Sequence, residues 1–298
     1  MRKLNEILNK YSLKPRKYEV RGKVTIIHTQ KGSYVIKEKN RDINNLIYEY
    51  LNSRNFDYYP KIISDSEDDY VITEYIEELN IPDEQKIIDM IDLVSLLHSK
   101  TTHYKEVDEA DYKKLYEDIA NNIEYLYSYY NDIITIIESR VYMSPAEYLL
   151  ARNISSIYSS LSFCKNELEK WYEIINKKTK QRLVVLHNNL NKSHFISNKS
   201  AYLINWDKSK IDIPIFDLYK LYKYHSLEYD FEEVLKRYER NYPLLEEERI
   251  LFFILIMLPD KLEFNNKNYE MTRMVSRMID NLYKTQKLIL PYYSNNAK

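Results

Sequence analysis

Glycine is almost absent from this sequence, with 2 residues among 298. At the usual frequency of about 7%, a chain of this length would contain roughly 21. Many phosphate-binding loops depend on glycine because it lets backbone N–H groups approach the anion closely. Gly22 and Gly32 cannot supply a Rossmann GxGxxG motif or a Walker P-loop, so both of these nucleotide-binding motifs are excluded. The many Asn, Lys, Ile and Tyr residues indicate AT-rich coding, which is a second reason for the shortage.

The rest of the composition is that of a globular protein. Hydrophobic residues make up 44% of the chain, so a large core can be buried, and length predicts one large or two small domains. With 44 basic and 45 acidic residues, we expect no general attraction to nucleic acid or to an anionic membrane. The longest apolar run, Ile250 to Leu258, is too short to span a bilayer. The charged first ten residues do not resemble a secretory signal, and Cys164 is a single cysteine, so a cytoplasmic location is expected.

The first 77 residues predict a small antiparallel sheet with one helix. Residues 18–37 alternate in short bursts around a Gly-containing turn at 30–33, which is typical of a β-hairpin. Apolar residues recur at helical intervals over 41–53. Residues 61–64 and 70–75 then predict two more strands around an acidic turn. The expected order is therefore strand, strand, strand, helix, strand, strand.

Beyond Pro82 the pattern becomes helical almost throughout. An apolar face runs from Ile87 to Leu97. Further helices are predicted over 110–138, 145–176, 214–241, 244–258 and 268–288, with strands at 182–186 and 201–204. The chain therefore predicts a small β-rich lobe followed by a larger α-rich lobe.

Two motifs in the second half of the chain point to a family. Residues 184–195 read VVLHNNLNKSHF, residues 202–207 read YLINWD, and IPIFDL follows at 213–218. The chain resembles the aminoglycoside phosphotransferase and choline kinase-like branch of the protein kinase-like fold, in which these motifs read H-G-D-L-x-x-x-N, I-D-W or I-D-F, and D-P-x-x-D-L. Within that branch it is most similar to the spore-coat-associated kinase-like proteins. The resemblance implies a two-lobed α+β fold, with an N-lobe at 1–77 and a helical C-lobe at 78–298.

The resemblance also assigns residues in the small lobe. Lys37 ends the sequence Val-Ile-Lys, which resembles the strand lysine that contacts the nucleotide phosphates in the family. Its expected ion-pair partner is Glu49, twelve residues later on the predicted helix. Glu74 and Ile76 belong to the expected hinge, whose backbone meets an adenine in family members. The alternative is that Lys37 is an ordinary solvent-facing strand lysine.

The catalytic positions depart from the family pattern. Asn189 replaces the catalytic Asp, His194 falls on the metal-binding Asn, and Asn205 replaces the metal-binding Asp. A neutral amide at position 189 cannot take up the proton of a nucleophile. Mg²⁺ prefers hard anionic oxygens, so Asn205 and His194 are poor ligands for it. Asp207 shares a strand face with Asn205 and is a possible replacement ligand.

Two other family positions are retained. His187 is the catalytic-loop histidine, which the resemblance implies holds the loop rather than reacting. Asp217 matches an Asp at a helix start, where its carboxylate can cap backbone N–H groups and support the loop. A fold that is kept while its reacting residues are lost is the pattern expected of a pseudokinase.

Other charged and aromatic segments have ordinary explanations. The Tyr-rich acidic stretch from 106 to 138 favours an amphipathic helix with a solvated acidic face, although it could also receive a cationic ligand. The basic residues between 177 and 182 are expected in a solvated loop. The 6 His residues do not show the HExxH spacing of a zinc site.

The sequence leaves three alternative functions for this protein. The first is a pseudokinase that acts as a binding or assembly module, with little or no Mg²⁺-dependent ATP binding and with spore-coat protein partners implied by resemblance. The second is an active but atypical ATP-dependent phosphotransferase on a small molecule or protein. The third has a nucleotide bound as a structural ligand without metal. ATP and Mg²⁺ are the cofactors that the resemblance implies.

Overall fold

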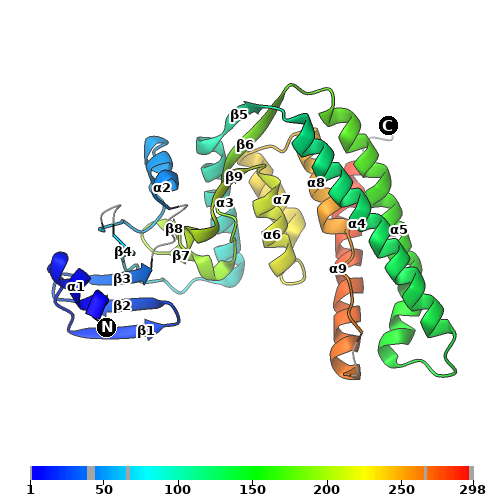
Figure 1. The fold of residues 1–298 in the computed structure, drawn as a ribbon, viewed down its shortest axis with the longest axis horizontal. Coiled ribbons are helices and arrows are strands. Elements are labelled where there is room, and N and C mark those ends of the chain that lie inside the picture. Colours follow the sequence, from blue (N-terminus) through cyan, green and yellow to red (C-terminus); the bar gives the residue numbers. More distant parts are fainter. Residues whose placement is uncertain (1, 39–43, 65–67, 265–266, 295–298) are drawn as a thin grey trace. The chain divides into compact units, whose positions relative to one another are not determined.

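The computed structural model describes residues 2–38, 44–64, 68–264 and 267–294. The chain forms two compact units, whose elements are labelled in Figure 1. The first unit comprises Met1–Thr102, Val184–Asp212 and Arg237–Tyr242, and the second comprises His103–Leu183, Ile213–Lys236 and Pro243–Lys298. An antiparallel sheet comes first along the chain and a helix-rich part follows, as expected. The lobe boundary after residue 77 stays a prediction.

A four-stranded antiparallel sheet forms the start of the first unit. It has the strand order β1-β2-β3-β4. The strands are β1 (Lys17–Arg21), β2 (Val24–His28), β3 (Ser33–Glu38) and β4 (Tyr70–Glu74). Gly22 and Lys23 connect β1 to β2, and Gly22 has a φ of +60°. Two-residue hairpins of type II′ place a glycine with positive φ at this first turn position.

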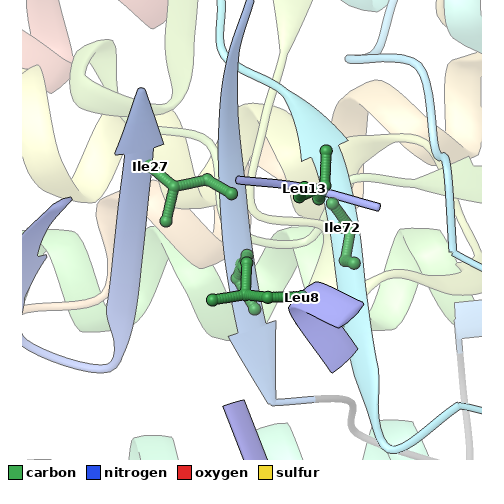
Figure 2. Close-up of a cluster of buried hydrophobic side chains, with 5 residues drawn as sticks. Leu8, Leu13, Ile27 and Ile72 are labelled. Carbon is green, nitrogen blue, oxygen red and sulfur yellow. The ribbon is translucent and has the colours of Figure 1, made fainter. Parts of the chain in front are cut away.

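One face of this sheet is covered by the N-terminal segment. Strand alternation puts Ile27, Ile36 and Ile72 on the same face, and all three are buried. Leu8, on α1 (Arg2–Lys10), and Leu13 pack against these isoleucines in one hydrophobic cluster. Figure 2 shows Leu8 and Leu13 lying over the strands that carry Ile27 and Ile72. Helix α1 was not among the predicted elements, and it supplies the apolar cover that this face needs.

The predicted strand over 61–64 is wrong as a regular element. This segment forms a single bridge, between Ile62 and Thr73. The N–H of Ile63 donates to the carbonyl of Ile72, but the N–H of Ile72 donates to the Ser64 hydroxyl rather than to a backbone carbonyl. A side-chain acceptor of this kind competes with the ladder and ends regular pairing.

The remaining elements of the first unit carry the two motifs of the second half of the sequence or lie next to them. They are α2 (Asn44–Ser53), α3 (Asp83–Thr101), η1 (Lys192–His194), β7 (Phe195–Ser197), β8 (Ala201–Leu203), η2 (Trp206–Lys208) and β9 (Lys210–Asp212). Helix α3 packs against η1, β7 and β8. The second half of β6 (Lys180–Leu186) pairs with β9 in this unit, and its first half pairs with β5 (His103–Glu106) in the second unit.

The second unit is mainly helical. Its long helices are α4 (Glu109–Glu138), α5 (Pro145–Ile175), α8 (Glu246–Met257) and α9 (Asn268–Ser294). Helix α5 packs against α4, α8 and α9, as Figure 1 also shows. Among the described residues, no helix is both long and apolar enough to cross a membrane.

The single helix predicted over 214–241 is instead two helices. They are α6 (Ile215–His225) and α7 (Phe231–Asn241). The break occurs because the Asp230 side chain accepts a hydrogen bond from the N–H of Glu232 at 3.0 Å, which caps a new helix start. Apolar periodicity continues across this cap, so periodicity alone could not find it.

Helix α5 begins with a capping box. The Ser144 hydroxyl accepts from the N–H of Glu147, and the Glu147 carboxylate accepts from the N–H of Ser144 at 2.7 Å. Arg140 also contacts the Glu147 carboxylate, whose side chain is buried. These bonds satisfy N–H groups that would otherwise be unpaired at the helix start.

We expect Leu8→Ala to destabilise the first unit by about 2–4 kcal/mol, because the vacated space cannot be refilled by neighbouring strands. Chemical denaturation followed by tryptophan fluorescence would measure this loss. Val20→Ala is the matched control, because Val20 lies on the same sheet but is 67% exposed. Its effect should stay within about 0.5 kcal/mol. Equal effects of the two substitutions would contradict the packing of α1 on the sheet.

We expect Ser144→Ala to cost about 1 kcal/mol of unfolding free energy, because the N–H of Glu147 loses its acceptor. Thermal unfolding followed by circular dichroism would detect the change. Ser128→Ala is the control, because Ser128 is exposed within α4 and alanine is the better helix former there. A loss in the control as large as that in Ser144→Ala would argue against the cap.

Candidate functional site

A short hairpin brings the two second-half motifs together. Strands β7 and β8 pair with Phe195 opposite Leu203. The pairing continues beyond the strands, because the N–H of Ile204 donates to the carbonyl of His194 at 2.9 Å. His194 and Asn205, which are 11 residues apart, therefore lie side by side, with their side chains 3.0 Å apart.

Asn205 lies at the centre of a hydrogen-bond network. Its Oδ1 accepts from Lys37 Nζ at 2.9 Å, and its Nδ2 donates to His194 Nε2 at 3.0 Å. His194 Nδ1 donates in turn to the backbone carbonyl of Asn189 at 2.7 Å. A carbonyl can only accept, so Nδ1 carries the proton and Nε2 is the acceptor of a neutral imidazole. Every polar atom of the Asn205 amide and of the His194 ring has a protein partner in the part of the chain that the structure describes.

Lys37 has a second partner in Asp207. Its Nζ donates to the Asp207 carboxylate in a short ion pair, and both side chains are partly exposed. Burial, and secondarily the nearby ammonium of Lys23, lower the pKa of Lys37. Lys37 opposes Val24 on β2 and Val71 on β4, so its side chain shares their face of the sheet, opposite the face covered by α1.

Two asparagines shape the loops of the site. Asn188 and Asn205 have φ values of +59° and +66°, in the left-handed region. Asparagine is the residue other than glycine that most often adopts this conformation. Asn188 also donates from its side chain to the carbonyl of Lys208 at 2.7 Å, which ties the two loops together. Asn188 stands where the resemblance places a glycine, and asparagine can adopt the positive φ found there.

A buried histidine and a buried tryptophan pack against these loops. His187 is fully buried, and its Nε2 donates to the carbonyl of Ile204 at 2.8 Å. Its ring meets the Trp206 ring edge to face, with centroids 4.9 Å apart. Trp206 is 2% exposed and also packs against Phe56 and Tyr59. His187 therefore packs beneath the loops, and its role in holding the catalytic loop stays a prediction.

A cleft of about 580 Å³ opens beside this network, within the first unit. One wall is the uncovered face of the sheet, with Val24, Ile26 and Val35. Another wall contains Ile196 and Ile204, from the hairpin region. The polar side chains that line the cleft are Lys23, Lys37, Glu38, Thr73, Glu74, His194, Asn205 and Asp207.

The structure gathers most of the predicted site residues in this cleft. Lys37, His194, Asn205 and Asp207 form its polar end, and Glu74 and Ile76 line it at the end of β4. Asn189 contributes its backbone carbonyl to the network. Its side-chain amide makes no hydrogen bond to another described residue.

Two predicted residues lie elsewhere. Glu49 is exposed on α2, and the structure shows no ion pair between it and Lys37 among the described residues. Glu49 does not pair with Lys37 because the Lys37 ammonium already donates hydrogen bonds to Asp207 and Asn205. Asp217 is fully buried in the first turn of α6, in the second unit, so it sits at a helix start as predicted.

Sequence reasoning did not single out three residues that line the cleft. Lys23 follows Gly22 in the β1–β2 turn, Tyr48 lies on α2, and Trp206 follows Asn205. Burial raises the pKa of the Tyr48 phenol, so it stays neutral. The sequence feature that could have pointed to Lys23 is its position next to Gly22, the single glycine of this hairpin.

The polar residues of the cleft do not fit Mg²⁺. This ion requires oxygen ligands in octahedral geometry, commonly including one or two carboxylates. Here the Asn205 oxygen and the Asp207 carboxylate both face the Lys37 ammonium, and His194 offers nitrogen. The described residues contain no group of three or more His, Cys, Asp or Glu side chains arranged to hold a metal.

Comparison with known proteins gives matches in structure and not in sequence. No protein-family model matches the sequence, and no curated protein matches it significantly. An aminoglycoside phosphotransferase from Alicyclobacillus acidocaldarius superposes with a TM-score of 0.71 at 11% identity, covering 97% of this chain and 94% of that one. Spectinomycin phosphotransferase in its AMP complex superposes with a TM-score of 0.57 at 13% identity, covering 95% and 97%. Choline kinase LicA from Streptococcus pneumoniae gives 0.50 at 18% identity, covering 97% and 98%.

These similarities extend over nearly the whole chain in each comparison. At 11–18% identity they establish the fold and leave the activity open. The expected α+β class is confirmed, with the N-terminal antiparallel sheet followed by the helix-rich part. The chain therefore has the protein kinase-like fold of the aminoglycoside phosphotransferases and choline kinases.

Proposed function

We propose that this protein is a pseudokinase, a binding module on a kinase-like fold with impaired Mg-ATP phosphoryl transfer. The single observation that carries the proposal is the hydrogen-bond network through Asn205. The network joins Lys37, Asn205, His194 and the Asn189 carbonyl in one closed set of bonds. At the positions that hold metal in the related family, the side chains are thus hydrogen-bonded to other residues of the same chain.

The loss of charge at these positions has a direct consequence for catalysis. Phosphoryl transfer depends on metal ions that neutralise the phosphates and on a residue that orients or deprotonates the nucleophile. The neutral Asn189 amide cannot accept a proton at physiological pH, although it can still orient a hydroxyl. With neither a carboxylate at position 189 nor a suitable donor set for Mg²⁺, both requirements are unmet.

The cleft nevertheless retains features that suit a nucleotide-sized ligand. Its volume of about 580 Å³ falls within the usual range for small-molecule sites, about 300–1,000 Å³. The N–H of Ile76 makes no hydrogen bond to another described residue, so it is available to a ligand at the expected hinge. The spectinomycin phosphotransferase structures contain AMP in one case and ADP with spectinomycin in another. Ligand binding without metal, as a structural or signalling event, is consistent with all of these features.

One observation favours the alternative of an active, atypical phosphotransferase. Asp207 places a carboxylate in the cleft beside Lys37. If a ligand phosphate took over Lys37, this carboxylate would be released and could serve as a metal ligand. A substrate would then be a small molecule or a protein. The proposed role in spore-coat assembly rests on the sequence resemblance alone.

We expect no transfer of γ-phosphate from ATP with Mg²⁺ or Mn²⁺, to water or to a broad panel of aminoglycosides, choline and proteins. The reason is the missing base and the missing metal donors. Radiolabelled ATP and thin-layer chromatography would measure turnover. Transfer above background that disappears in both Lys37→Ala and Asp207→Asn would overturn the proposal and support the alternative.

We also expect Mg²⁺-dependent ATP binding to require two restoring substitutions together. Asn205→Asp alone supplies a carboxylate, but the neighbouring His194 imidazole conflicts with Mg²⁺ binding, because it offers nitrogen where this ion prefers oxygen. His194→Asn removes this conflict and restores an amide oxygen. The double variant should therefore show a Mg²⁺-dependent thermal shift with ATP that neither single variant nor the natural protein shows. A shift of several degrees in the natural protein that is lost in Lys37→Ala would contradict the proposal.

A further inference from the structure

The charged groups of the cleft do not form an anion site. Among the described residues that line it, Lys23 and Lys37 are basic, whereas Glu38, Glu74 and Asp207 are acidic. The formal balance is therefore two positive charges against three negative ones. His194 adds no charge, because its hydrogen bonds hold the neutral tautomer.

The lysine best placed for a phosphate is already bound. Lys37 donates to Asp207 and to Asn205, and both of these partners come from the segment after β8. A phosphate that approached Lys37 would lie beside the Asp207 carboxylate and would compete with it. Like charges at this distance repel strongly in a partly desolvated site. Each additional phosphate therefore adds repulsion. Lys23, the other lysine of the described lining, is exposed in the β1–β2 turn and leaves the acidic groups in excess.

The remaining lining favours an uncharged, flat group. Apolar and aromatic side chains come from the sheet, from α2 and from the hairpin region. They are Val24, Ile26, Val35, Tyr48, Val71, Tyr75, Ile76, Ile196, Ile204 and Trp206. Burial keeps the Tyr48 phenol neutral. Apolar and aromatic walls with a few polar groups at one end are typical of small-molecule sites, and such walls suit an uncharged heteroaromatic base.

We propose that the cleft selects a nucleoside or nucleoside monophosphate over a nucleoside triphosphate, and that Asp207 sets this preference by neutralising Lys37. This inference rests on the proposed function and names the ligand class of the same site. The bound group is a heteroaromatic base in the apolar slot, with a sugar directed to the Lys37 end. Asp207 acts as a specificity determinant, through its ion pair with Lys37.

Isothermal titration calorimetry in EDTA tests this order with two series of probes. These are adenosine, AMP and ATP, and guanosine, GMP and GTP. In at least one series the nucleoside or monophosphate should bind, and the triphosphate should bind at least about tenfold more weakly. A triphosphate that binds as tightly as its nucleoside, or no binding in either series, would overturn the inference.

The role of Asp207 has its own test. Asp207→Asn removes one negative charge and frees Lys37, so the triphosphate should gain at least about fivefold in affinity. The nucleoside should change by less than about twofold, because it carries no charge for Lys37 to attract or Asp207 to repel. Asp212→Asn is the matched control, since Asp212 pairs with Lys210 on β9 in the same unit and does not line the cleft. It should leave every affinity unchanged.

Equal changes for nucleoside and triphosphate in Asp207→Asn would show that Asp207 only supports the fold, and would overturn its assigned role. Failure of the proposed function is distinguishable from failure of this inference. Metal-dependent turnover of ATP would contradict the proposed function, whatever the order of affinities. Tight binding of a triphosphate in EDTA would contradict this inference, whether or not any phosphate is transferred.

Discussion

The orientation of one side-chain amide determines the chemistry of the cleft. Asn205 presents its oxygen to the Lys37 ammonium and its NH₂ to His194 Nε2. The reverse orientation would set the NH₂ against the ammonium and the oxygen against an imidazole lone pair, so only one arrangement satisfies both neighbours. His194 is fixed in turn by the Asn189 carbonyl. Because each bond specifies the next, a metal cannot enter this network without breaking several of its bonds together.

The scaffold that supports this network does not use the side chains of Asn189 and His194. His187 donates to the Ile204 carbonyl and packs on Trp206, and both side chains are buried. Asn188 and Asn205 adopt left-handed backbone conformations that hold the turns of the two loops. Buried contacts and backbone geometry of this kind stabilise the fold whether or not phosphate is transferred. These contacts do not depend on the side chains at positions 189 and 194, which is consistent with a shared fold at 11–18% sequence identity.

The sequence could predict those features of the fold in which a residue's role depends on its neighbours along the chain. The β1–β3 strands and the long helices belong to this class. The expectation that Lys37, His194, Asn205 and Asp207 share one site came from the family resemblance instead. Features set by distant contacts could not be predicted. The Lys37–Asp207 pair joins residues 170 apart, and it replaces the expected partner Glu49. The Ser64 hydroxyl and the Asp230 cap each ended an element that periodicity alone would have continued.

The shortage of glycine has a more specific meaning once the cleft is known. A glycine-rich loop lets backbone N–H groups surround phosphates, and the β1–β2 turn has a single glycine followed by Lys23. Gly22 serves the positive φ of the turn, and a substituted side chain there would meet no neighbouring atom. Its role is therefore conformational, and the turn offers one flexible ammonium in place of a set of N–H donors. Together with a Lys37 that is held by Asp207, this turn leaves the cleft with apolar walls as its main source of affinity, which favours a base and a sugar over a chain of phosphates.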